Sequence, residues 1–566
     1  MTLLDLVLVV ALAAFVLAWW RRRLPGRGVV LWVSALVALG AGVAGVIDDR
    51  WQAGVGAAVA VVFVLGLALG RWCGRRRAPR TGTPWISGPF VTLLALLGFL
   101  ALYLFPVFDL PVPSGPNPVG VRTFELSDPS RPGVLLAGPD EPRRLLVRVW
   151  YPAGDVTGLA RRPYFTQAEA DGMVNGIGAM MGFPAFAKYM KHARTHSYED
   201  APLQPGAEDL PTVFYSHGFH SFLSQNTALM EELASHGYVV YSVQHTYDAA
   251  GTVFADGSVA PLDPALITQA KQSPEARGEF SEAFVKGFTG ASVAERLTGQ
   301  LQNAQDKIAA HDRIITVSGP IWLADRLFVH DRLQQGRVPA SVADVVAASG
   351  LARTGEMGMS FGGSTSGAVC MVDPRCAAGI NLDGADFHFL GLDADMPRPF
   401  LMFHSDFTRM ASHFSADKDR VVDFGFNDFS YESFERAGTR HDIYRMQLKE
   451  TEHIGFSDMA WFMRRPLRDG VLGSAPAKVM LGAQNDFVRG FFDRHLRGRD
   501  NGFPETEYAQ YEGYVRRHDN SAVRRWWQTQ PEATRAEWVA RVQGLRAIEA
   551  EAVPAPSGEP SVPAEP

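Results

Sequence analysis

The sequence is poor in cysteine and carries no excess of positive charge. Its 566 residues include three cysteines, too few for a disulfide-built scaffold, and no Cys/His cluster has the spacing of a zinc site. The formal net charge is −6, which gives no sign of nucleic-acid binding. We therefore expect no metal, no cofactor and no nucleic-acid partner.

Two of the cysteines, Cys370 and Cys376, lie close together in the sequence. They could form one disulfide if their region meets an oxidising compartment, or they could be two buried free thiols. The sequence leaves both open, and we expect the free thiols.

Long apolar runs gather in the first hundred residues. Each approaches the ~20 residues needed to cross a bilayer, and they cover Leu3–Trp20, Val29–Ile47, Gly54–Gly70 and Phe90–Phe108. The first run has no positive charge before it and arginines after it, unlike a signal peptide. The sequence therefore predicts a four-span transmembrane domain over residues 1–108.

Arginines give this domain an orientation. Basic residues follow the first and third spans, at Arg21, Arg22, Arg23, Arg27, Arg71, Arg75, Arg76, Arg77 and Arg80. The loop between the second and third spans holds Asp48, Asp49 and Arg50. Because basic loops stay in the cytoplasm, we expect everything after Phe108 on the extracytoplasmic side of the plasma membrane. We expect no ionisable residue inside a span, so the bundle is interpreted as an anchor.

The remainder divides into four regions by composition. Residues 109–120 form a Pro-rich linker, and 121–500 form an α/β domain with a helical insertion at about 255–340. Residues 501–552 are expected to be a helical extension, and 553–566 a disordered tail. The insertion could cap the active site or simply pack extra helices on the sheet, and the sequence favours neither.

Short β-rich runs alternate with helical stretches through the α/β domain. Leu145–Tyr151 alternates apolar and polar residues, and buried-strand runs follow at Thr212–Tyr215, Tyr238–Val243, Gly355–Met359, Ala378–Leu382, Phe400–Phe403 and Tyr444–Leu448. This alternation predicts a mostly parallel sheet covered by helices on both faces.

The pentapeptide Gly358-Met359-Ser360-Phe361-Gly362 has the GxSxG pattern of a nucleophile elbow. It follows a strand-like run, and its glycines allow the sharp turn that exposes a serine. Upstream, a strand ends at His217-Gly218, where this fold places an oxyanion donor. We expect Ser360 as the nucleophile and the backbone N–H groups of Phe219 and Phe361 as the oxyanion hole.

The base should be a histidine late in the chain, in the order Ser, Asp, His. His453 follows the run Tyr444–Leu448 and fits this position, against the competitors His404, His413, His441 and His495. Two carboxylates could orient this histidine. Asp383 follows the first strand after the nucleophile, and Asp406 follows the second. Asp386 and Glu452 are weaker candidates.

Four sequence blocks resemble the type II (plasma-type) platelet-activating factor acetylhydrolases and their bacterial relatives in the α/β-hydrolase superfamily. They are Gly115–Gly120 with Val149–Pro152, Ala201–Pro205 with Ser216–Gly218, Gly358–Gly363 with Asn381–Gly384, and His453 with Phe456 and Asp458. The resemblance implies Asp383 as the acid, and Asp406 stays the alternative acid from its position after a strand. The resemblance also implies hydrolysis of short or oxidised acyl chains of phospholipids without calcium or a cofactor.

Met359, the long insertion and the membrane bundle depart from that family's pattern. The overall prediction is a membrane-anchored serine esterase or lipase that acts on an acyl ester or lipid. The alternatives are a non-catalytic membrane receptor on a hydrolase fold, or an acyltransferase that uses the same triad.

Overall fold

The computed structural model describes residues 1–74, 84–133, 141–176, 178, 182–272, 277–408 and 425–552. Arg75, Arg76, Arg77, Arg80, His413 and the expected tail over 553–566 lie outside these ranges. The chain divides into two compact units. Unit 1 contains Met1–Leu110, Pro163–Thr195 and Trp461–Gly470, and unit 2 contains Pro111–Arg162, His196–Ala460 and Val471–Pro566.

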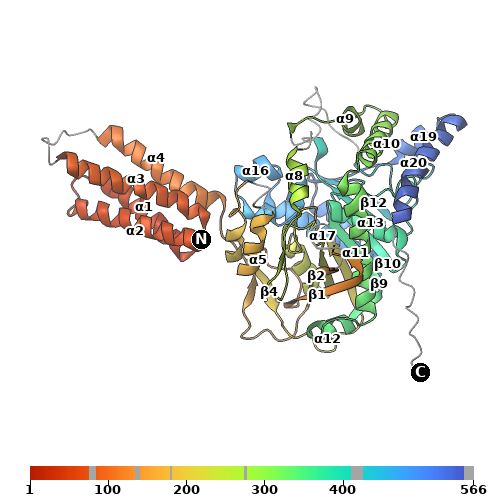
Figure 1. The fold of residues 1–566 in the computed structure, drawn as a ribbon, viewed down its shortest axis with the longest axis horizontal. Helices are drawn as coiled ribbons and strands as arrows, with labels where there is room; N and C mark the ends of the chain where they lie inside the picture. Colours follow the sequence, from red (N-terminus) through yellow and green to blue (C-terminus); the bar gives the residue numbers. More distant parts are fainter. Residues whose placement is uncertain are drawn as a thin grey trace. The chain divides into compact units, whose positions relative to one another are not determined.

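Four long apolar helices form the core of unit 1, and Figure 1 shows them side by side. They are α1 (Leu3–Trp20), α2 (Arg27–Ile47), α3 (Trp51–Gly74) and α4 (Pro84–Leu104). Within the described residues these four helices are long and apolar enough to cross a membrane, by length and composition. Small residues let them approach closely: a Cβ on Gly42 would lie 2.7 Å from Ala57 Cβ.

One expectation about the bundle is wrong, because α1 contains a buried ionisable residue. Asp5 lies in the first turn of α1, and its Oδ2 is 2.9 Å from Arg50 Nη2, with both side chains fully buried. A buried carboxylate needs such a partner. Arg50 comes from the turn between α2 and α3, so the sequence separation of 45 residues hid the pair.

Two segments distant in sequence belong to the same unit as the helices. They contain α5 (Gln167–Gly172), the 3₁₀ turns η1 (Met173–Asn175) and η2 (Lys188–His192), and α15 (Met459–Phe462) in part, with α16 (Leu467–Leu472) in part. Asp49 pairs with Lys188 and Lys191, each at 2.8 Å, and the Trp51 ring packs edge-on against Phe183. The expected boundaries assigned both segments to the α/β domain, whereas their contacts group them with the four helices.

Unit 2 is built on a large mixed sheet. Its strands are β1 (Val119–Pro132), β2 (Pro142–Pro152), β3 (Arg161–Pro163), β4 (Arg194–Glu199), β5 (Leu210–Ser216), β6 (Val239–Gln244), β9 (Ser349–Met359), β10 (Cys376–Leu382), β11 (Phe400–His404), β12 (Ile443–Leu448) and β13 (Val515–Arg517). Among the described residues their order is β13-β12-β11-β10-β9-β5-β6-β2-β1-β4-β3. The central run from β12 to β6 is parallel, which is the arrangement of an α/β-hydrolase-like fold.

Successive residues of the central strands face opposite sides of the sheet. Val213 and Tyr215 join one apolar core with Leu229 of α7 (Thr227–Ser235) and Phe487 of α17 (Ala477–His495). The intervening Phe214 joins a second core, which includes residues of α11 (Gly319–Gln334) and α12 (Ala343–Ala347). Helices therefore cover both faces, as the continuous apolar strand runs predict.

The insertion adopts two kinds of structure. A small hairpin of β7 (Thr252–Val253) and β8 (Val259–Ala260) precedes α8 (Pro264–Gln272), α9 (Glu282–Thr289), α10 (Val293–Ala309), the π-helical turn η4 (Ile314–Ser318) and α11. Helix α11 is a sheet-covering helix, because Arg326 on it pairs with Glu356 of β9 and both are buried. Helices α9 and α10 pack against each other, and α10 also contacts α19 (Ser521–Gln528) and α20 (Glu532–Ala552), as Figure 1 shows.

Two further features differ from expectation. Cys370 and Cys376 are joined by a disulfide, with 5.1 Å between their Cα atoms, so the expected free thiols are wrong. They meet because Cys370 lies near the end of α13 (Phe361–Val372) and Cys376 begins β10. The region expected as a helical extension contains α18 (Glu505–Gln510), α19 and α20 but also β13, which pairs antiparallel with β12.

Candidate active site

The parallel strands place the predicted site residues at one edge of the sheet. Ser216 at the end of β5 pairs with Gly358, and Met359 at the end of β9 pairs with Leu382. Leu382 in turn pairs with Phe403 of β11. Because the carboxyl ends of these strands are in register, the loops that follow them converge, as in other open α/β sheets.

Ser360 occupies a sharp turn between β9 and α13. Its backbone has φ 58° and ψ −122°, a conformation that non-glycine residues rarely adopt. Its N–H donates to Leu382 O at 2.8 Å, which fixes the turn against β10. This is the strained geometry that the GxSxG pattern predicts.

The glycines flanking Ser360 are required by close backbone contacts. A Cβ on Gly358 would lie 2.2 Å from the carbonyl carbon of Gly362. A Cβ on Gly362 would lie 2.1 Å from the carbonyl oxygen of Ser216 on β5. Neither neighbour is a flexible side chain, so the turn accepts no larger residue at either position.

The structure brings Ser360, His453 and Asp383 together in a hydrogen-bonded row. His453 Nε2 is 2.9 Å from Ser360 Oγ, and His453 Nδ1 is 2.6 Å from Asp383 Oδ2. His453 begins the 3₁₀ turn η6 (His453–Phe456), which follows β12. The His453 side chain is 47% exposed whereas Asp383 is fully buried, so the serine and the imidazole are accessible and the carboxylate is not.

Buried contacts hold Asp383 as a carboxylate. Its Oδ1 accepts a hydrogen bond from Ser405 N at 2.7 Å, and His404 Nδ1 is 3.8 Å away. Burial alone would raise the pKa of Asp383, but the His404 and His453 side chains outweigh it and hold the pKa well below its usual range. The sequence did not predict that His404 and Ser405 contact Asp383. These contacts arise because β11 pairs with β10 in the sheet, which no local sequence pattern shows.

The alternative acid, Asp406, has other hydrogen-bond partners. Its carboxylate accepts from the backbone N–H of Glu450 at 2.9 Å and of Thr408 at 3.1 Å. Its own N–H donates to Thr451 O at 2.8 Å. Asp406 therefore fixes the start of the loop that carries His453, while Asp383 contacts the imidazole.

The two predicted oxyanion residues are neighbours. The rings of Phe219 and Phe361 are 5.3 Å apart, and a Cβ on Gly218 would lie 3.4 Å from Ser360 Cβ. Phe361 is the first residue of α13, and the first N–H groups of a helix have no partner within it. This arrangement can present two backbone donors beside the serine.

His217 and Gln225 support the loop that carries Phe219. His217 is buried, its Nδ1 donates to Gly218 O at 2.7 Å, and its Nε2 accepts from His245 N at 3.2 Å. Burial, with His245 nearby, lowers the pKa of His217 to about 3, so it is neutral. Gln225 Oε1 accepts from Gly218 N at 2.7 Å, a contact that the sequence did not indicate.

The competing histidines lie elsewhere. His404 is buried beside Asp383, His495 at the end of α17 is 2.9 Å from the Tyr444 hydroxyl, and His441 is exposed before β12. In the part of the chain that the structure describes, no three His, Cys, Asp or Glu side chains could together hold a metal ion.

Comparisons with known proteins agree with the sequence resemblance. The family described as "Platelet-activating factor acetylhydrolase, isoform II" matches residues 106–272. A guinea pig (Cavia porcellus) platelet-activating factor acetylhydrolase is 23% identical over 281 residues, covering 47% of this chain and 56% of the relative. A chicken (Gallus gallus) protein of the same name is 23% identical over 282 residues, covering 49% and 60%.

A fungal relative matches over a longer stretch. The "Probable 1-alkyl-2-acetylglycerophosphocholine esterase" of Arthroderma benhamiae is 23% identical over 437 residues, covering 71% of this chain and 93% of the relative. A solved structure of a ferulic acid esterase from Streptomyces cinnamoneus has a TM-score of 0.47 and 23% identity, covering 73% of this chain and 99% of that one. The chain thus spans little more than half the length of the two animal relatives, and its resemblance to the acetylhydrolase family is confirmed.

Proposed function

We propose that this chain is a membrane-anchored serine esterase in which Ser360, His453 and Asp383 form the catalytic triad. The observation that carries the proposal is the row of hydrogen bonds from Ser360 Oγ through His453 to the buried Asp383. The names of the relatives, which are acetylhydrolases and an esterase, support ester hydrolysis as the reaction.

The arrangement supports a two-step acyl transfer. Ser360 Oγ attacks the carbonyl carbon of the ester while His453 Nε2 takes the hydroxyl proton. The charge that develops on the carbonyl oxygen is stabilised by the N–H groups of Phe219 and Phe361, each worth about 3 kcal/mol. The bond to the alcohol oxygen then breaks, and His453 returns the proton to that oxygen.

Water completes the cycle on the same residues. It attacks the acyl-enzyme carbonyl, gives its proton to His453, and releases the carboxylic acid as Ser360 recovers the proton. Asp383 stays ionised throughout, keeps His453 in the tautomer with its proton on Nδ1, and stabilises the imidazolium. Its low pKa, set by His404 and His453, suits that role.

Three observations support membrane anchoring with the esterase unit outside the cytoplasm. Four helices are long and apolar enough to span a bilayer. The arginines that follow α1, with Arg71 at the end of α3, fit cytoplasmic loops. The disulfide between Cys370 and Cys376 fits an oxidising compartment. We place the chain in the plasma membrane with unit 2 on the extracytoplasmic side.

The substrate is an acyl ester with an apolar part. The relatives' names point to a phospholipid with a short acyl chain, and a membrane anchor would keep the site close to lipid. The reaction needs no metal or cofactor, since the proposed triad and backbone donors supply the proton transfers and the charge stabilisation.

Active-site labelling tests the proposal directly. Membranes carrying the full chain would be treated with a fluorophosphonate, and hydrolysis of p-nitrophenyl acetate would be measured in parallel. Ser360→Ala should lose all labelling and about 10⁶-fold in kcat, the size of loss when a triad serine is removed. Ser341→Ala, at an exposed position on the 3₁₀ turn η5 (Ala340–Val342), is the matched control and should behave as wild type.

Absence of labelling in correctly folded wild type would sink the proposal and favour a non-catalytic receptor. Labelling with transfer of the acetyl group to an added alcohol, and no release of acetate, would favour an acyltransferase instead.

A further inference from the structure

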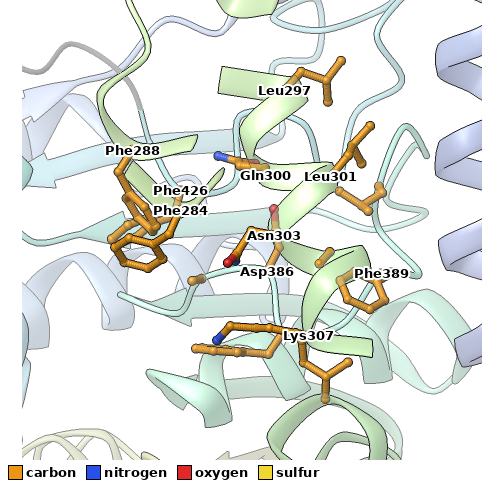
Figure 2. A pocket seen from close by; sticks show the side chains of 15 residues that line it. Phe284, Phe288, Leu297, Gln300, Leu301, Asn303, Lys307, Asp386, Phe389 and Phe426 are labelled. Atoms are coloured by element: carbon orange, nitrogen blue, oxygen red, sulfur yellow. The ribbon is translucent and has the colours of Figure 1, made fainter. Parts of the chain in front are cut away.

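An apolar pocket of about 140 Å³ lies between the insertion helices and the loop that follows Asp383. Five phenylalanines among the described residues line it, and Figure 2 shows Phe284, Phe288 and Phe426 gathered on one side, with Leu301 and Phe389 on the other. Helix α10 supplies most of one wall, including Leu297, Leu301 and Ala304, which are buried. The sequence resemblance assigns nothing to this insertion.

One wall of the pocket is formed by a loop that packs against the nucleophile elbow. A Cβ on Gly384 would lie 2.2 Å from Ser360 O, and the next residues along the chain, Ala385, Asp386 and Phe387, line the pocket. The Phe387 N–H donates to Ser364 Oγ on α13 at 3.1 Å, and its ring lies 5.3 Å from that of Phe361. The loop that lines the pocket is therefore packed against the backbone of the elbow that carries Ser360.

A second row of contacts connects the pocket with the triad acid. Phe288 on α9 packs edge-on against Phe426 at 4.8 Å, and Phe426 packs against Phe407 at 3.9 Å. Phe407 lies 5.5 Å from His404, which is the neighbour of Asp383. Two lining residues of the pocket, Phe387 and Phe426, thus pack near Phe361 and His404, which neighbour the proposed triad.

We propose that this pocket, formed by α9, α10 and the 384–392 loop, binds the acyl group of the ester, and that it fits an apolar group of about one aromatic ring. The proposal rests on the esterase function proposed above. The phenylalanines that line the pocket provide ring faces and edges that pack well with an aromatic or short aliphatic group.

The size of the pocket sets the size of the group. A cavity of about 150 Å³ lined by apolar side chains holds a benzene molecule, and this pocket is about 140 Å³. A benzoyl ring or a chain of a few carbons would fill it, whereas a long fatty acyl chain would not.

The position of His453 indicates that the acyl group, and not the alcohol, enters the pocket. His453 must give a proton to the leaving alcohol, so the alcohol lies on the His453 side of the site. Among the described residues, the pocket lining comes from α9, α10, η4, the loop after β10 and Phe426, with none from the loop that carries His453. The acyl part, which stays on Ser360 in the intermediate, is left for the pocket.

Selectivity between acyl groups tests the proposal. The full-length wild type should hydrolyse p-nitrophenyl benzoate and butyrate with a higher kcat/KM than the acetate, and the palmitate poorly. Ala304→Trp fills the pocket and should lower the benzoate-to-acetate ratio of kcat/KM by about tenfold or more, as a blocked apolar pocket does. Ala309→Trp, on the exposed side of the end of α10, is the matched control and should leave that ratio within about twofold of wild type.

Each outcome decides the question. Only preparations whose serine titrates stoichiometrically with a fluorophosphonate are compared, so failure to label wild type overturns the esterase function itself and not just the pocket. If Ala304→Trp does not label, Leu301→Ala decides, because enlarging the pocket should raise the ratio for bulkier acyl groups. An unchanged ratio in both variants, or a change that follows the alcohol in a series of alkyl acetates, would overturn the proposal.

Discussion

The nucleophile elbow and the pocket of the insertion meet at the same loop after β10, but they are constructed differently. At the elbow, backbone packs directly against backbone: a Cβ added to Gly362 would lie only 2.1 Å from Ser216 O. In the pocket, the wall is formed by side chains of helix α10 such as Leu301 and Ala304. We infer that the elbow fixes the chemistry and that the insertion sets the selectivity.

The largest expected effect comes from adding one methyl group at the elbow. Gly362→Ala should abolish labelling and lower the free energy of unfolding by at least about 3 kcal/mol, because overpacking against fixed backbone is costly. Gly544→Ala on α20 is the control, since a Cβ there meets nothing within 4 Å. Thermal unfolding and fluorophosphonate labelling of both variants would measure the difference. Wild-type labelling in Gly362→Ala would show that the elbow is less constrained than the backbone contacts indicate.

The two carboxylates after β10 and β11 should differ almost as strongly. Asp383→Asn should lower kcat by about 10⁴-fold, because an amide cannot hold the imidazole in the required tautomer. Asp406→Asn should cost about tenfold at most, since it loses hydrogen bonds to the backbone of the His453 loop. Steady-state kinetics on p-nitrophenyl acetate would compare them, with Ser341→Ala as the control.

A larger loss in Asp406→Asn than in Asp383→Asn would reverse the assignment of the acid. Equal small losses would mean that His453 is oriented by its loop alone, and the buried pair with Asp383 would then be structural.

The positions of most strands could be predicted because their apolar runs are local. Thr212–Tyr215, Ala378–Leu382 and Phe400–Phe403 lie inside β5, β10 and β11. The elbow was equally readable, since its two glycines and its serine act within five residues. The alternation of strands with helices predicted the parallel arrangement. The edge strand β13 could not be predicted, because its three residues give no periodic pattern.

Long-range pairing is what the sequence could not specify. Asp383 and Asp406 both follow strands, and position alone could not choose between them; only the family resemblance favoured Asp383. The pair of Asp5 with Arg50 was missed for the same reason, because it depends on which turns the fold brings together. The disulfide of Cys370 with Cys376 spans a sequence separation of only six, and what the sequence left open there was whether the compartment is oxidising.

The insertion was ambiguous because its two parts look alike in sequence. Both parts consist of amphipathic or polar helices. In α11, however, Trp322 and Arg326 are buried in the core, whereas in α10 Leu301 and Ala304 line a pocket. Only the neighbours of each helix separate a sheet-covering role from a pocket wall.

The smallest expected effect is a pH dependence of selectivity that originates in the pocket. Asp386 lines the pocket, and burial raises its pKa to about 7, although Asn427, Ser430 and Arg445 act to lower it and Asp428 acts to raise it. Lys307 lies in the same lining and is within 3.9 Å of Asp312. Below pH 7 the Asp386 carboxyl is neutral and tolerates an apolar neighbour, whereas above pH 7 the carboxylate resists losing its solvent.

The benzoate-to-acetate ratio of kcat/KM should therefore fall as the pH rises from 6 to 8. The fall should be about fivefold if bound substrate raises the pKa of Asp386 from about 7 by one unit. Using a ratio cancels any pH dependence of the chemical steps that both substrates share. Asp386→Asn has no carboxyl to ionise, so its ratio should stay flat over the same range. A wild-type ratio that does not change with pH, or an Asp386→Asn ratio that still falls, would place the selectivity in the shape of the pocket walls alone. The pocket would then differ from the elbow only in how closely its side chains are packed, and Asp386 would have no part in selectivity.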